Sequence, residues 1–97
     1  MKNINRIKDI LKTNKQMIME EYGVKEIALF GSYVRGEQKR NSDIDVIVEF
    51  KTAPDLLRFI ELERLLHRKL GEKIDLVRKK SIRKELRQSI LKEAVTI

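Results

Sequence analysis

Apolar residues recur at helical spacing in three segments of the chain. In residues 3–22 they repeat about every 3.6 positions between charged residues, and Gly23 follows as a stop signal. A second stripe occupies residues 55–70 before Gly71, and a third follows Ser81, which is a suitable N-cap. The pattern therefore predicts three amphipathic helices. Their expected core positions are Ile4, Ile7, Ile10, Leu11, Met17, Ile18 and Tyr22, then Leu56, Phe59, Ile60, Leu62, Leu66 and Leu70, then Ile82, Leu86, Ile90 and Leu91.

Three short apolar or β-branched runs predict strands between these helices. The runs are residues 26–30, 43–50 and 73–77. The order is therefore helix, strand, strand, helix, strand, helix, with no repeat and no low-complexity linker. This order predicts an α/β (α+β) fold. We expect one small domain over residues 1–97, with a mixed β-sheet of about three to four strands flanked by helices.

Composition and charge narrow the classes of function. The chain lacks cysteine, which excludes disulfides, thiolate metal sites and a cysteine nucleophile. The formal net charge of +7 favours polyanionic partners, such as nucleotides, nucleic acids or an acidic protein surface. No apolar run reaches the length of a signal peptide or a bilayer span. We expect a soluble cytoplasmic protein without membrane association.

Acidic residues mark the predicted strands. Asp43 and Asp45 are two positions apart, so on a strand they share a face with Cβ atoms roughly 6–7 Å apart. If Asp75 enters from an adjacent strand, each pair of like charges about 4 Å apart repels by roughly 4 kcal/mol at an effective dielectric constant near 20. Carboxylate oxygens favour hard cations, and Mg²⁺ is commonly held by a few carboxylates together with substrate phosphates. The pattern predicts a site for a metal-bound nucleotide, although Asp75 also fits an ordinary strand end.

The junction at Gly31 and Ser32 is the second chemical feature. After a strand, this pair offers backbone N–H groups and a hydroxyl that suit phosphate oxygens. Gly-Ser alone is commonly a turn and Asp-x-Asp alone is commonly a strand edge, so the two motifs gain weight only together. On a helix beginning at Ser32, Arg35 shares the phosphate-facing side, and a surface salt bridge is an equal alternative for its guanidinium.

The combined string, Gly31-Ser32-Tyr33-Val34-Arg35-Gly36 followed by Asn41-Ser42-Asp43-Ile44-Asp45-Val46, resembles a known signature. It is similar to that of the minimal nucleotidyltransferases within the DNA polymerase beta nucleotidyltransferase superfamily, and the resemblance spans almost the whole chain. It implies the nucleotidyltransferase fold. It also implies that Gly31 and Ser32 hold a triphosphate, that Asp43 and Asp45 bind two Mg²⁺ ions, and that Asp75 completes the site.

The resemblance carries further expectations about activity and partners. Such proteins transfer a nucleoside monophosphate, here expected to be AMP from ATP, to a hydroxyl acceptor. They are paired with a helical HEPN-domain protein as antitoxin to a toxin, and some members adenylylate a tyrosine of that partner. We therefore expect an oligomer, either with that partner or between copies of the chain.

Two alternatives remain open on the sequence. One is a catalytically silent antitoxin that acts by docking to a HEPN-type partner, although the intact Gly31-Ser32 and Asp43-Ile44-Asp45 motifs argue against it. A basic nucleic-acid-binding module is the third reading, although the sequence lacks an aromatic-rich RNA-binding signature.

Overall fold

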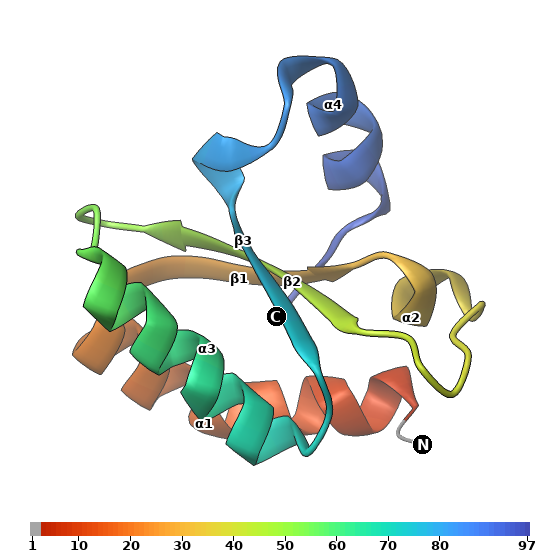
Figure 1. The fold of residues 1–97 in the computed structure, drawn as a ribbon, viewed down its shortest axis with the longest axis horizontal. Coiled ribbons are helices and arrows are strands. Elements are labelled where there is room, and N and C mark those ends of the chain that lie inside the picture. The colour runs from red at the N-terminus through yellow and green to blue at the C-terminus, as the bar shows by residue number, and fades with distance from the viewer. Residues whose placement is uncertain (1–2) are drawn as a thin grey trace.

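Four strands form one mixed sheet in the computed structural model, which describes residues 3–97 (Figure 1). The strands are β1 (Val24–Phe30), β2 (Ile44–Phe50), β3 (Ile74–Arg78) and β4 (Val95–Thr96), in the order β3-β2-β1-β4. β1 pairs antiparallel with β2 and β4, whereas β2 pairs parallel with β3. The predicted α/β fold class with a sheet of three to four strands is confirmed.

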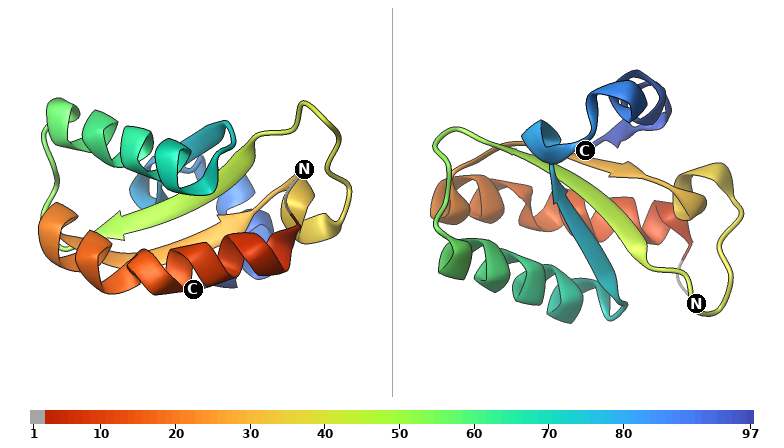
Figure 2. Two further views of the ribbon diagram at one scale, coloured as in Figure 1. Left: turned by 90° about the horizontal axis from the view of Figure 1, so that it is seen from below. Right: turned by 45° about the horizontal axis from the view of Figure 1, so that its top comes forward.

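Helices cover both faces of this sheet. They are α1 (Ile4–Tyr22), α2 (Ser32–Arg35), α3 (Leu56–Leu70) and α4 (Lys84–Glu93), with a 3-10 turn, η1, at Lys79–Ser81. α1 and α3 lie side by side on one face, and α4 lies on the other (Figures 1 and 2). None of the described helices combines the length and apolar character required to cross a bilayer.

Side-chain caps fix the beginnings of the two long helices. The Asn3 side chain accepts a hydrogen bond from the Arg6 N–H at 3.0 Å, and the Asp55 side chain accepts one from the Arg58 N–H at 2.7 Å. Each cap satisfies a backbone donor that has no partner within its helix. Local sequence therefore sets both boundaries, and the predicted helices are confirmed to within one residue.

The core has two parts, one on each face of the sheet. The larger part packs α1 and α3 against the sheet, and the smaller part lies beneath η1 and α4 around Ala28, Ile47 and Ile82. Because both faces of β1 and β2 are covered, each strand contains a continuous apolar run, residues 27–30 in β1 and 46–48 in β2. The fully buried side chains include Ile7, Leu11, Ile18, Val24, Ile27, Leu29, Ile44, Val46, Val48, Leu62, Leu66 and Leu70.

The prediction for the last helix is wrong in two respects. Ser81 belongs to η1 and does not cap α4, whose N-cap position is Arg83 without a side-chain cap. None of the described residues of α4 is buried, and Leu86 is 49% exposed. The other expected core positions are confirmed: Ile82, which precedes the helix, is buried in the small core, and the half-buried Ile90 and Leu91 of α4 pack against it.

The first turn of α3 also differs from the prediction. Leu56 is 74% exposed rather than part of the core, and Leu65 is buried in its place at 7% exposure. This turn lies beside a groove at the rim of the molecule, not over the sheet. Apolar periodicity identifies which face of a helix is buried, but it does not show where along the helix the contact with the sheet ends.

Two elements are very short: β4 is absent from the sequence prediction, and α2 corresponds to the helix considered there to begin at Ser32. α2 has four residues and β4 has two, which is too short for a periodic signal. β4 exists only because Ala28 and Leu29 of β1 pair with Thr96 and Val95.

Candidate active site

The predicted acidic residues meet at one end of the sheet. The parallel register of β2 and β3 pairs Asp45 with Asp75, which places these residues on neighbouring strands about 4.8 Å apart. Asp43 immediately precedes β2, and its charge acts on Asp45. The structure thus brings together three carboxylates separated by up to 32 positions in the sequence (75 minus 43).

This crowding changes the acidity of Asp45. Burial is the largest cause, followed by the charge of Asp75, a hydrogen bond with its side chain and the charge of Asp43; together they raise the pKa of Asp45 from 3.8 to about 6. The positive charge of Arg35 opposes the increase. A carboxylate held in this way destabilises the folded protein unless a cation or a proton neutralises it.

The donor set suits a hard divalent cation. The oxygens of Asp43, Asp45 and Asp75 are the type that Mg²⁺ prefers, and one or two carboxylates with substrate phosphates are its usual ligands in such sites. Within residues 3–97, no three His, Cys, Asp or Glu side chains are already gathered tightly enough to hold a metal ion by themselves. Nucleotide phosphates would therefore have to supply part of the coordination.

Gly31 connects β1 to α2 directly beside these acids. Phe30 is the register partner of Asp45, so the end of β1 lies against the site. Gly31 has φ 81° and ψ −154°, a conformation essentially restricted to glycine. A Cβ atom there would lie 2.9 Å from the Cγ atom of Asp45 and closer still to its Oδ2 atom. The turn needs glycine because its backbone touches the carboxylate.

Ser32 and Arg35 lie on α2, which begins where the sequence predicts. Ser32 is the first residue of the helix and is half-buried. The exposed Arg35 side chain donates from Nε to Glu37 at 2.7 Å and from Nη1 to Glu93 at 2.9 Å. Arg35 is thus near Asp45, and its guanidinium is engaged in ion pairs in this structure.

Glu93 is a residue of this site that the sequence analysis missed. Its Oε1 atom accepts hydrogen bonds from the Gly31 N–H at 3.0 Å and from Arg35 at 2.9 Å. One carboxylate oxygen therefore joins the end of α4 to the glycine turn and to α2. The contact with Gly31 spans 62 positions, so no local pattern could reveal it.

We expect Glu93→Ala to destabilise the protein by about 1–3 kcal/mol, because the buried Gly31 N–H loses its acceptor. Glu93→Gln should lose less stability, because its side-chain amide oxygen can still accept the hydrogen bond from the Gly31 N–H. Urea unfolding measures both changes. Glu37→Ala is the matched control, because it removes the other ion pair of Arg35 at an exposed position and should change stability little. Equal losses in Glu93→Ala and Glu37→Ala would contradict the structural role of Glu93.

The raised pKa of Asp45 predicts a pH-dependent stability. The folded protein binds this proton more tightly than the unfolded chain, so the stabilisation is complete below about pH 4 and is lost as the pH rises through about 6. The full shift corresponds to about 3 kcal/mol, and partial exposure of the group reduces the expected loss to about 1–2 kcal/mol. This loss of stability is measured by urea unfolding in EDTA at several pH values, for the natural protein and for Asp45→Asn. Parallel pH profiles for the two proteins would contradict the prediction.

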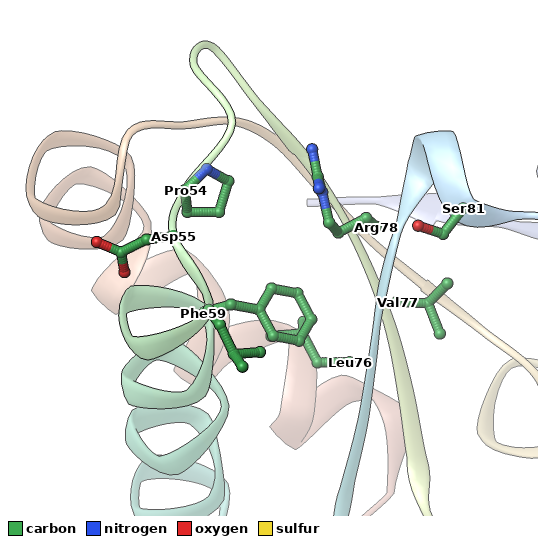
Figure 3. Close-up of a pocket in the computed structure, with 8 residues that line it drawn as sticks. Pro54, Asp55, Phe59, Leu76, Val77, Arg78 and Ser81 are labelled. Atoms are coloured by element: carbon green, nitrogen blue, oxygen red, sulfur yellow. The ribbon is translucent and has the colours of Figure 1, made fainter.

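An open cavity of about 470 Å³ is not lined by the glycine turn or the paired acids. It lies between the beginning of α3 and the carboxyl end of β3, and Figure 3 shows Phe59 and Leu76 at its centre. Asp75 belongs to the same strand but does not line this cavity, and the neighbouring Leu76 projects to the opposite face of the sheet.

A family model and individual known proteins agree on the class of protein that this chain resembles. The family described as "Nucleotidyltransferase domain" matches residues 4–97. The protein adenylyltransferase MntA of Thermococcus cleftensis is 44% identical over 97 residues, which cover 100% of this chain and 98% of that protein. The matched region includes the positions of the glycine turn and all three acids.

Two solved structures extend the comparison to complexes. A toxin–antitoxin complex with AMP-PNP contains a chain that is 33% identical, with a TM-score of 0.69 over 95% of this chain and 69% of that one. A chain in the complex of a tri-AMPylated HEPN toxin of Shewanella oneidensis with its MNT antitoxin is 27% identical, with a TM-score of 0.60 over 95% of this chain and 66% of that one.

Proposed function

Because this chain belongs to the nucleotidyltransferase family, we propose that it is a protein adenylyltransferase that transfers AMP from ATP to a hydroxyl group of a HEPN-domain toxin, for which it serves as antitoxin. The observation that carries this proposal is the register pair Asp45–Asp75 beside the glycine turn at Gly31. The activity of the relative from Thermococcus cleftensis and the AMPylated toxin in the Shewanella oneidensis complex support the nucleotide and the acceptor.

We assign the two sides of the site to the two substrates. Gly31 and Ser32 form the turn that receives the triphosphate, with Arg35 as an added positive charge on α2. Asp43 and Asp45 would hold two Mg²⁺ ions together with the phosphates, and Asp75 would complete this ligand set. When bound, Mg²⁺ supplies charge stabilisation for the phosphoryl oxygens and the leaving group.

The proposed reaction balances without a covalent enzyme intermediate. The acceptor hydroxyl oxygen forms a bond to the α-phosphorus, and the bond from that phosphorus to the β-phosphate oxygen breaks. Pyrophosphate leaves with the electron pair of that bond. The hydroxyl proton passes to the carboxylate of Asp75, which lies on the strand at the edge of the sheet. The work of the protein is to position two substrates and to hold charge next to them.

The test is direct transfer to the purified HEPN-domain protein from the same cells. The two proteins are incubated with α-labelled ATP and Mg²⁺, and the acceptor is examined for label and for the mass increase of AMP. Label from the α position on the toxin, located by peptide mass spectrometry at a hydroxyl side chain, is the expected result. Binding of the toxin without any label, in the presence of bound ATP, would replace this proposal with docking alone.

A further inference from the structure

An open apolar groove lies at the edge of the sheet, between α3 and β3. Its apolar lining consists of Pro54, Leu56, Phe59, Leu76 and Val77, from the loop before α3, the first turn of α3 and the second half of β3. Figure 3 shows Pro54, Phe59, Leu76 and Val77 around one hollow, with Arg78 at its upper end. The volume of about 470 Å³ is in the range of cavities that hold a ligand or several side chains of a partner.

Two exposed leucines lie in the first turn of α3, of which only Leu56 lines the groove. Leu56 is 74% exposed and Leu57 is 68% exposed, and both lie in the first turn of α3. Together with Leu86 they are the large hydrophobic residues that the described chain leaves exposed. Exposed apolar side chains beside a groove are typical of interaction sites.

Positive charges border this groove on one side. Arg78 lines both the groove and an adjoining small hollow, which is also lined by Lys51, Lys79 and Lys80. Asp55 and Glu49 are the acids that line the same two hollows, so four cations face two anions there. This basic rim favours a partner whose apolar side chains are flanked by acidic ones.

The groove lies along the free edge of β3, the strand that carries Asp75. β3 is an edge strand and pairs only with β2 among the described strands, so the main chain of its other side is available for a partner. Asp75 and Val77 project to the same face because they are two positions apart, at a separation of roughly 7 Å. Leu76 and Phe59 belong to the core on the opposite face. The groove therefore reaches the face of Asp75 through Val77, around the edge of β3. The glycine turn, which receives the triphosphate in the proposed reaction, lies beyond Asp45 on the opposite side of Asp75.

We propose that this groove, with the free edge of β3 and its basic rim, is the docking surface for the acceptor protein, which inserts an apolar segment flanked by acidic residues and so delivers its hydroxyl group to Asp75. The inference rests on the proposed adenylyl transfer to a HEPN-domain protein. It identifies the part of this chain that selects the acceptor, separately from the residues that hold ATP.

The two adjacent leucines provide a matched pair of variants. Leu56 lines the groove and Leu57 does not, yet both are exposed in the first turn of α3, where a Glu is equally compatible with the helix N-terminus. We expect Leu56→Glu to raise the Kd for the purified HEPN-domain protein at least tenfold, because a charge replaces an apolar contact. Leu57→Glu should change it less than about twofold. Isothermal titration calorimetry measures both values.

The basic rim is tested by Lys80→Glu, with Lys12→Glu on α1 as its control, since both lysines are exposed. Lys80→Glu should weaken binding of the HEPN-domain protein several-fold, and Lys12→Glu should not. A single-stranded RNA oligonucleotide is titrated as well. If RNA competes with the toxin, and Lys80→Glu weakens binding while Leu56→Glu does not, the surface binds nucleic acid and the proposal is overturned.

Measurements of AMP transfer and of toxin binding together distinguish the proposed docking surface from the proposed transferase function. Tight binding that is sensitive to Leu56→Glu but is not accompanied by AMP transfer supports the docking surface and overturns the transferase function. Transfer of AMP with equal Kd values for both leucine variants overturns the docking surface alone. Failure of the natural protein to bind the HEPN-domain protein overturns both. ATP affinity of Leu56→Glu should equal that of the natural protein, which excludes general unfolding as the cause.

Discussion

Replacing Asp45 with Asn is expected to reduce AMP transfer by about a thousandfold or more, because it removes a carboxylate that the proposed mechanism uses to hold Mg²⁺ against the triphosphate. A loss of about 4 kcal/mol in transition-state stabilisation corresponds to this factor. In the absence of divalent cations the same variant should be more stable than the natural protein at pH 7, since burial and the neighbouring Asp75 and Asp43 disfavour the Asp45 carboxylate. Opposite effects on activity and stability distinguish a functional acid from a structural one.

Asp9→Asn is the control for this substitution. Asp9 lies at an exposed position on α1, away from the site, so its loss removes the same formal charge without affecting the paired acids. Label transfer under saturating ATP gives the activity, and thermal unfolding with and without Mg²⁺ and ATP gives the stability. Mg²⁺ with ATP should raise the melting temperature of the natural protein and of Asp9→Asn, but not that of Asp45→Asn. An active Asp45→Asn would remove the basis of the site assignment.

Gly31→Ala should have the second large effect, on both stability and activity. The backbone conformation at Gly31 is essentially restricted to glycine, and a methyl group would also overlap the carboxylate of Asp45. We expect a loss of about 2–4 kcal/mol in the free energy of unfolding, together with loss of AMP transfer, because the turn must move away from the acids. Urea unfolding and label transfer are the two measurements.

Gly36→Ala is a matched control because Gly36 also has a positive φ, of 70°, but a Cβ atom there meets nothing within 4 Å. This variant should incur only the backbone cost of about 1–2 kcal/mol and retain most of its transfer activity. The difference between the two variants measures the importance of close contact at Gly31. If both variants retain activity, the close packing of Gly31 on Asp45 has no functional meaning.

Local patterns were sufficient for most secondary structure. Asn3 and Asp55 cap their helices through short-range contacts, and the glycines that end α1 and α3 are visible in the sequence. The beginning of the last helix was mispredicted because Ser81 is a plausible cap by type. In the structure it belongs to a 3-10 turn, since the preceding strand must first deliver Ile82 to the small core.

The residues of the site also fall into two groups, those that local spacing indicated and those that only folding brings together. Gly31, Ser32, Asp43 and Asp45 follow one another within 15 residues, so their spacing alone indicated a nucleotide site. Asp75 was a candidate only on the assumption of adjacent strands, and the parallel register of β2 and β3 supplies that adjacency. The Arg35 ion pairs, the role of Glu93 and the exposed groove depend on chain segments that meet only after folding.

The sequence by itself determined the periodicity of the long helices, the apolar strands, the net positive charge and the family signature, because each depends on residue type and short spacing. Tertiary structure alone decided which acids are partners, why Asp45 resists ionisation, which carboxylate holds the glycine turn and which leucines remain exposed. The physical reason is that strand register, burial and contacts across 62 positions are properties of the packed chain, and no local pattern encodes them.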